Sequence, residues 1–256
     1  MYEFDYLWKG GPEFAQSENF RFGTDSVLLG NFPSVSGVKK GIDLGCASGV
    51  ITMILLARSA SLHMTGLEID PEAAALAREN IARNSFQDRC TIVGGDIRRC
   101  RELLPSGGFD LVVSNPPYFA VKAGQVSPDA RRATARGEVE CTLEELCAAA
   151  AYLCRWGGRV AFVYRQERLS ELLCTMTKHG IEPKRLRLVS HFWDSVPSLV
   201  LVEGRRGGSA GMKVEPQLVI KNHDGTDTAE IRRIYHMDQE QEESLNQNAD
   251  NTLPLT

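Results

Sequence analysis

From Lys40 onward, short apolar runs alternate with runs that have the composition of helices, and this alternation constrains the fold more than any other feature. The first apolar run is GIDLG at 41–45, and the helix-like run VITMILLARSA follows it at 50–60. Further strands are expected at 63–70, 90–96, 109–114, 157–164 and 198–204. Further helices are expected at 71–85, 142–154 and 166–179. This spacing predicts a doubly wound α/β fold with a parallel sheet.

Two of the expected helices begin with capping residues. Pro71 stands in the first turn of the helix at 71–85, where proline is tolerated, and Asp70 before it suits a helix cap. Thr142 and Glu145 have the spacing of a capping box at the start of the helix at 142–154. These residues predict where both helices begin.

Composition narrows the class of protein. No apolar stretch in the 256 residues reaches the roughly 18 residues of a membrane helix, and the opening MYEFDYLWKGG is unlike a signal peptide. The seven cysteines include no C-x-x-C pair, which favours reduced thiols in the cytoplasm over a disulfide framework or a zinc site. We therefore expect a cytoplasmic protein without a metal. Because the net charge is −4, a nucleic-acid partner requires a local basic patch.

The loop DLGCASG at 43–49 connects the first strand to the first helix. Its small residues Gly45, Ala47 and Gly49 let a ligand approach the backbone, and the helix N-terminus favours electronegative groups. A tight strand–helix connection has the same composition, so the loop by itself leaves both interpretations open. Glu68 ends the second strand, where doubly wound folds bind ribose hydroxyls. The spacing G-x-A-x-G differs from the G-x-G-x-x-G that binds NAD.

This loop resembles the D-x-G-x-G-x-G loop of the class I S-adenosylmethionine-dependent methyltransferases, with Asp43 first and Ala47 in place of the middle glycine. The resemblance implies a Rossmann-like doubly wound, mostly parallel seven-stranded sheet with an antiparallel last strand. It also implies S-adenosylmethionine as cofactor, with its methionine part close to the backbone of Gly45 and Gly49.

The same resemblance implies roles for residues that follow the second and third strands. Glu68 takes both ribose hydroxyls, and Asp96 accepts a hydrogen bond from the adenine amino group. Ile69 and Ile97 sandwich the adenine ring. Asp70 competes with Glu68 for the ribose, but its position before a proline favours a helix cap.

The strand at 109–114 ends in Asn115-Pro116-Pro117-Tyr118. By itself this stretch suits a loop, yet its place at a strand end beside the cofactor suits catalysis. An exocyclic amine on an aromatic ring is a poor nucleophile because its lone pair is delocalised. The side-chain carbonyl of Asn115 and the main-chain carbonyl of Pro116 could accept both N–H groups and aim the lone pair at the methyl carbon. Both prolines stiffen the backbone, and Tyr118 offers a stacking face worth about 1–3 kcal/mol.

This stretch resembles the N/D-P-P-Y/F/W motif of amino-methyltransferases, which modify adenine in DNA or RNA, guanine N2 in ribosomal RNA, or a glutamine amide in release factors. Flanking segments narrow the choice. Thr24 and Asp25 in GTDSVLL could cap a helix, but the segment is similar to one that closes over the cofactor in bacterial tRNA1(Val) adenine-37 N6-methyltransferases. The segments A-R-x-E, TLEEL and VPSLVLVEGRRGG also look like that family, and the resemblance covers roughly residues 15–235.

Basic residues supply the patch that RNA requires. Arg131, Arg132 and Arg136 follow the N-P-P-Y motif, where they suit phosphate contacts, although a solvated loop is the simpler interpretation. A second candidate patch comprises Lys184, Arg185, Arg187, Arg205, Arg206 and Lys213.

The resemblance therefore implies N6-methylation of an adenine in RNA, with the anticodon stem-loop of a tRNA as partner and adenine 37 of a tRNA1(Val)-like molecule as target. We expect residues 1–36 to form a segment that covers cofactor or substrate, residues 37–237 the methyltransferase domain, and residues 238–256 a disordered acidic tail. Among the alternatives, a release-factor glutamine methyltransferase should carry a larger helical domain before Asp43, and a DNA methyltransferase should carry a target-recognition region. A nucleic-acid-binding module without catalysis is the non-enzymatic alternative.

Overall fold

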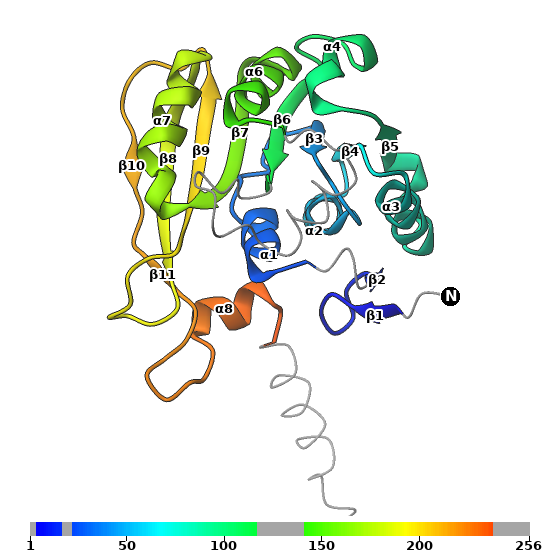
Figure 1. Cartoon of the computed structure of the whole chain (residues 1–256). Helices are drawn as coiled ribbons and strands as arrows, with labels where there is room; N and C mark the ends of the chain where they lie inside the picture. Colours follow the sequence, from blue (N-terminus) through cyan, green and yellow to red (C-terminus); the bar gives the residue numbers. More distant parts are fainter. Residues whose placement is uncertain (1–3, 17–21, 117–140, 238–256) are drawn as a thin grey trace, which may run out of the picture.

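The computed structural model describes residues 4–16, 22–116 and 141–237, and its centre is a nine-stranded sheet (Figure 1). From one edge to the other the strands are β10 (Lys213–Val214), β8 (Ile181–Ser190), β9 (Leu199–Arg206), β7 (Cys154–Arg165), β6 (Phe109–Ser114), β3 (Lys40–Leu44), β4 (His63–Glu68) and β5 (Cys90–Gly94). The short strand β11 (Leu218–Val219) also pairs with β8. Strand β9 runs antiparallel to β7 and β8, and the other pairs are parallel. The predicted doubly wound, mostly parallel sheet with an antiparallel strand is confirmed.

Two features of this sheet differ from the sequence-based expectation. The two-residue strands β10 and β11 extend the expected seven strands to nine. Strand β8 was not singled out as a strand, because Pro183 and four charged residues interrupt its apolar pattern. The ladder accommodates the proline by a register shift between Pro183 and Arg185, so pairing with β9 continues on both sides.

Helices cover both faces of the sheet because strand side chains alternate between two cores. Leu111 and Val113 of β6 pack in one core, and Val112 between them packs in the other. The first core is closed by α1 (Thr24–Asn31), α2 (Val50–Arg58), α3 (Pro71–Arg83) and α8 (Ala229–Ile234). The second core is closed by α4 (Cys100–Leu103), α6 (Leu143–Leu153) and α7 (Leu169–Lys178). Three short 3₁₀ turns complete the described elements: η1 (Gln87–Arg89), η2 (Ile97–Arg99) and η3 (Gln166–Arg168).

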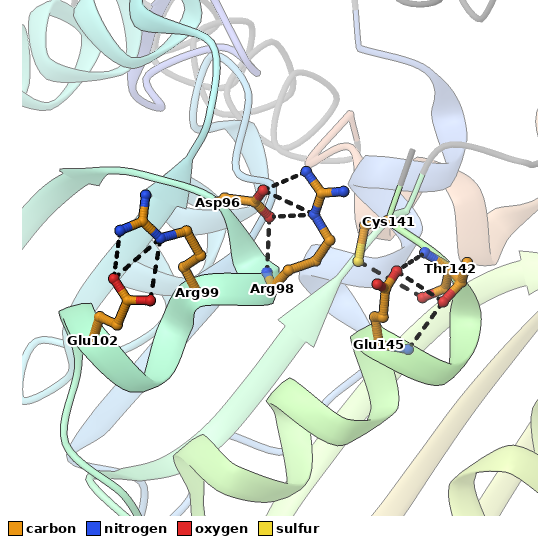
Figure 2. Close-up of polar contacts among 7 residues, drawn as sticks. All are labelled: Asp96, Arg98, Arg99, Glu102, Cys141, Thr142 and Glu145. Atoms are coloured by element: carbon orange, nitrogen blue, oxygen red, sulfur yellow. Dashed lines mark hydrogen bonds and ion pairs between the residues drawn. The ribbon is translucent and has the colours of Figure 1, made fainter. Parts of the chain in front are cut away.

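The predicted helix starts are confirmed. Asp70 caps α3 by accepting hydrogen bonds from the backbone N–H groups of Glu72 and Ala73. Thr142 and Glu145 form the predicted capping box at the start of α6 (Figure 2).

The N-terminal segment packs against the sheet's helices. A hairpin of β1 (Phe4–Tyr6) and β2 (Glu13–Ala15) precedes α1 and is held to α3 by Asn80, whose side chain bonds the N–H and carbonyl of Ala15. Helix α1 contributes Val27, Leu28 and Leu29 to the same core as α2. A domain boundary at residue 36 stays a prediction, and the expected tail at 238–256 lies outside the described residues. None of the helices described is long and apolar enough to cross a membrane.

The carboxyl ends of four strands meet at one edge of the sheet. After β3 the chain continues to β4 and β5 on one side, and it then crosses to β6 on the other side of β3. Such a reversal of strand order leaves a crevice outside the carboxyl ends, which is where ligands bind in open α/β sheets. Helix α1 lies next to the carboxyl end of β6 (Figure 1).

Candidate active site

The loop between β3 and α2 has an unusual backbone. Gly45, Ala47 and Gly49 all have positive φ angles, of 73°, 46° and 89°. The left-handed conformation costs an L-residue about 1–2 kcal/mol, which explains why glycine is usual in such a loop and why Ala47 is strained there. The N–H of Ala47 donates to Oε2 of Glu68 over 2.8 Å, so the end of β4 holds the loop in this conformation.

Glu68 is buried at the carboxyl end of β4, with 8% of its surface exposed. Its Oε1 accepts from the N–H of Asp70 over 2.9 Å, while Oε2 accepts from Ala47. Burial raises the pKa of Glu68, although these two N–H groups favour its ionised form. Because each carboxylate oxygen can accept a second hydrogen bond, Glu68 retains acceptor capacity for a pair of hydroxyls.

Asp43 lies behind the loop and is completely buried. Its Oδ2 accepts from Oγ1 of Thr52 over 3.0 Å, and its Oδ1 has no hydrogen-bond partner among the described residues. Burial raises the pKa of Asp43 from 3.8 to about 7, and the nearby Glu68 adds to the effect. A buried carboxylate oxygen of this kind suits a cationic or N–H-bearing ligand.

Asp43 makes the stability of the unliganded protein depend on pH. The pKa of Asp43 is raised from 3.8 to about 7 in the folded chain. Its contribution to the free energy of unfolding is therefore fully present below pH 3.8 and is lost as the pH rises through about 7. Asp43→Asn cannot ionise, so the free energy of unfolding of the variant minus that of the wild type should increase by about 3 kcal/mol from pH 5 to pH 8. Urea titrations at both pH values measure this, and a difference that stays constant would contradict it.

Asp96 and Ile97 follow β5. Asp96 caps η2 by accepting from the N–H of Arg98, and the Arg98 guanidinium also binds both of its carboxylate oxygens (Figure 2). The guanidinium lowers the pKa of Asp96. Asp96 is therefore an ion-paired acceptor, and an adenine amino group would have to share it with Arg98.

The backbone between these residues is open to a ligand. A Cβ atom placed on Gly45 would lie 3.9 Å from Cδ1 of Ile97 and closer to no other non-neighbouring atom, and one placed on Gly94 would meet nothing within 4 Å. Ile69, directly after β4, is 51% exposed although it is a large apolar residue. Two apolar side chains beside an uncovered backbone and a buried carboxylate fit a nucleoside, so the residues present fit the cofactor that the sequence implies.

Asn115 stands at the carboxyl end of β6 and is held by α1. Its Nδ2 donates to Oγ of Ser26 over 2.9 Å, and Ser26 is buried. The preceding Ser114 is tied to β3 by a 2.6 Å hydrogen bond from its Oγ to the carbonyl of Leu44. Pro116 is buried, and the predicted Pro117 and Tyr118 lie outside the described residues. Ser26 is not predicted from the sequence, where its one signal is its place directly after Gly-Thr-Asp.

Helix α1 lies between this site and other parts of the fold. Oδ1 of Asp25 accepts from the N–H of Ser26 over 2.8 Å, but the N-cap residue of α1 is Gly23 and no side chain caps the helix. Helix α1 also contacts helix α8. Helix α1 therefore touches both Asn115, through Ser26, and α8.

The second predicted basic patch lies on β8 and β9, which are separated from Asn115 on β6 by strand β7. Lys184 and Arg185 lie midway along β8, where Arg185 pairs with Glu203, and Arg205 and Arg206 lie at the end of the antiparallel β9, opposite Arg159 and Ile181. Lys184 donates a hydrogen bond to the carbonyl of Ser209, and Arg185 donates to the carboxylate of Glu215. Arg205 donates to the carbonyl of Gly157, and Arg206 donates to the carbonyl of His179. Arg187 likewise pairs with Glu230. Arg131, Arg132 and Arg136 lie outside the described residues, so their role stays a prediction.

Comparison with known proteins identifies the relatives of this chain. The family model of the methyltransferase small domain matches residues 17–170. The chain is 36% identical over 196 residues to the tRNA1(Val) (adenine(37)-N6)-methyltransferase of Porphyromonas gingivalis, covering 74% of this chain and 76% of that protein. It is 32% identical over 207 residues to the enzyme of that name from Aeromonas hydrophila, covering 80% and 84%.

A solved structure shares the fold. The chain matches a predicted O-methyltransferase from Agrobacterium tumefaciens with a TM-score of 0.67, over 83% of this chain and 96% of that one. Their sequence identity is 18%, so this similarity shows the fold alone.

Proposed function

The chain belongs to the methyltransferase small domain family and to the tRNA1(Val) (adenine(37)-N6)-methyltransferase family, and on that premise we propose that it methylates N6 of adenine 37 in the anticodon loop of a tRNA1(Val)-like tRNA. S-adenosylmethionine is the methyl donor of this family. The observation that carries the proposal is the position of Asn115, which Ser26 holds at the carboxyl end of β6 beside the loop at 45–49.

The residues around Asn115 suit an amine as the group that is methylated. The donor, when bound, supplies a methyl group on a positively charged sulfur. The side-chain carbonyl of Asn115 and the main-chain carbonyl of Pro116 accept the two N–H groups of the amine, so that its lone pair points toward the methyl carbon. The amine proton leaves after the transfer, so the residues need no general base. Tyr118 provides the stacking face for the base, and Pro117 stiffens the turn.

The cofactor contacts follow from the residues on the carboxyl edge. Glu68 binds the ribose hydroxyls, Ile69 and Ile97 enclose the adenine, and Asp96 accepts from its amino group alongside Arg98. The other contacts are assigned to Thr24, Asp25, Asp43, Gly45, Ala47, Gly49 and Asn115. The fit rests on the uncovered backbone at Gly45, the exposed Ile69 and the buried acceptors Asp43 and Glu68.

A single-stranded anticodon loop suits this site. A loop adenine is already unpaired, so the enzyme avoids most of the cost of extruding a base from a duplex. Arg131, Arg132 and Arg136 are assigned to the phosphates beside the target base, and a cytoplasmic setting stays a prediction.

Ser26 is expected to act as a positioning residue through Asn115. Ser26→Ala removes the Oγ that accepts from Nδ2 of Asn115, so the amide is held less firmly and the reactive geometry is populated less often. We expect kcat to fall by about tenfold, because a small misplacement of a reacting group is costly, while the dissociation constant for S-adenosylmethionine stays unchanged. Ser26→Thr keeps the hydroxyl and should restore most of kcat. Equal kcat in all three proteins would contradict this role.

The proposed function is tested with deproteinised total RNA and labelled S-adenosylmethionine. The label should appear in the tRNA fraction, and nuclease digestion should identify it as N6-methyladenosine. Label in N2-methylguanosine would favour ribosomal RNA instead, and label only in an added release factor would favour the glutamine alternative; either result would overturn the proposal.

A further inference from the structure

Asp96, the acceptor proposed for the adenine amino group, is already bound on both oxygens by Arg98. Its Oδ1 accepts from the main-chain N–H of Arg98 over 2.8 Å and from Nε over 3.0 Å. Its Oδ2 accepts from Nε over 2.8 Å and from Nη2 over 2.5 Å. A carboxylate has about four lone-pair sites, and these four contacts occupy them all. An amino group therefore reaches Asp96 only where the guanidinium gives up a site.

The turn that carries this ion pair is fixed to the elements assigned to the cofactor. Ile97 stands between the two paired residues, and a Cβ atom on Gly45 would lie 3.9 Å from its Cδ1. The N–H of Gly95 donates to the carbonyl of Glu68 over 2.8 Å. The ion pair therefore lies beside the open backbone and the buried carboxylate that fit a nucleoside.

Asp96 keeps its orientation without the guanidinium. Its Oδ1 caps η2 through the main-chain N–H of Arg98, a bond that any residue other than proline provides at position 98. The side chains of Arg98 and Asp96 are 29% and 18% exposed, so the ion pair is partly solvated and weak. Loss of the Arg98 side chain therefore frees Oδ2 while the carboxylate stays in place.

A second acid lies near Arg98 on helix α6. Turn η2 packs against α6, and Figure 2 shows Arg98 between Asp96 and the start of that helix, where Cys141 and Glu145 lie. The carboxylate of Glu145 adds to the rise in the pKa of Arg98. A guanidinium that leaves one oxygen of Asp96 therefore stays in a negative environment, so its displacement by a neutral amino group costs little.

We propose that Arg98 tunes the affinity for the cofactor by competing with the adenine amino group for Oδ2 of Asp96. The inference rests on the proposed function, in which Asp96 accepts from that group, and it adds a residue that weakens binding. The amino group shares Asp96 with the main-chain N–H of Arg98 and replaces the guanidinium on one oxygen. Because the methyl donor and its demethylated product carry the same adenine, the competition favours release of the product.

The test compares Arg98→Met with Arg99→Met in the full chain. Each substitution removes one positive charge from the same turn and keeps an unbranched side chain, but the guanidinium of Arg99 binds Glu102 and not Asp96 (Figure 2). Isothermal titration measures the dissociation constants of S-adenosylhomocysteine and of its analogue in which hydrogen replaces the adenine amino group. The melting temperature of each variant reports an intact fold.

Arg98→Met should bind S-adenosylhomocysteine about threefold more tightly than the wild type does, because a partly exposed ion pair contributes little. Its affinity for the analogue should equal that of the wild type, since the analogue donates nothing to Asp96. Arg99→Met should bind both compounds as the wild type does. In an Asp96→Asn background, Arg98→Met should change neither affinity, because the contested carboxylate is gone.

Unchanged or weaker binding of S-adenosylhomocysteine by Arg98→Met would overturn the inference. An equal gain in Arg99→Met, or an equal gain for the analogue, would overturn it as well, because either would reflect charge and not competition for Asp96. A wild-type protein that binds neither compound would overturn the proposed function first and this inference with it.

Discussion

Asn115→Ala is expected to lower methyl transfer to tRNA by at least about 100-fold while leaving the affinity for S-adenosylmethionine nearly unchanged. The substitution removes the acceptor that orients the target amine, and it also removes the donor that bonds Ser26. Because Glu68 and the loop at 45–49 are held by each other, the cofactor side of the edge should remain intact. Single-turnover rates with bound cofactor measure the chemical step, and isothermal titration measures cofactor binding.

The matched variant Asn115→Asp tests whether the acceptor is what Asn115→Ala loses. Aspartate keeps a carbonyl-type acceptor, and the hydroxyl of Ser26 can donate to its carboxylate, so its rate should lie between those of Asn115→Ala and the wild type. A large loss of cofactor affinity in Asn115→Ala, or a rate close to wild type, would contradict the proposed role of Asn115.

Glu68→Ala is expected to have the opposite effect, raising the dissociation constant of S-adenosylmethionine at least about tenfold. Hydrogen bonds to a charged group contribute about 1.5–3 kcal/mol, and a loss of 1.4 kcal/mol corresponds to about a tenfold change. The variant also leaves the N–H groups of Ala47 and Asp70 without their acceptor, so a lower melting temperature is expected. Weaker binding by itself would therefore not prove contact with the ribose.

A cofactor analogue separates contact from structural support. S-adenosylhomocysteine and its analogue without ribose hydroxyls are titrated into the wild type and into Glu68→Ala. The wild type should bind the analogue more weakly, and the variant should bind both compounds about equally, because the partner of the hydroxyls is gone. An equal preference for the hydroxyls in both proteins would show that Glu68 supports the loop only.

The sequence predicts the strands whose local run of apolar residues matches their burial in the sheet. Strands β3, β6 and β7 are buried on both faces, so their apolar runs were visible without the structure. Strand β8 carries a proline and several charges, and only its pairing with β9 across a register shift makes it a strand. Tertiary pairing of this kind leaves no signal in a local pattern.

Residues of the candidate site could be predicted where a local sequence motif or the end of a strand marks their position. Ala47 was predicted from the loop motif and Glu68 from its place at the end of a strand, and the backbone N–H of residue 47 donates to Glu68. Ser26 was missed because its contact with Asn115 joins residues 89 positions apart. Composition likewise could not show that Arg205 and Arg206 lie near the amino ends of the parallel strands, since this depends on the antiparallel direction of β9.

Methylation of a defined transcript tests the central claim most directly. Unmodified tRNA1(Val) transcript and the same transcript with guanine at position 37 are incubated with the protein and labelled S-adenosylmethionine, and the methylated nucleoside is mapped. We predict one methyl group per tRNA, as N6-methyladenosine at position 37, and none in the guanine transcript. Methylation at another position, equal labelling of both transcripts, or no labelling by a protein that binds S-adenosylmethionine would contradict it.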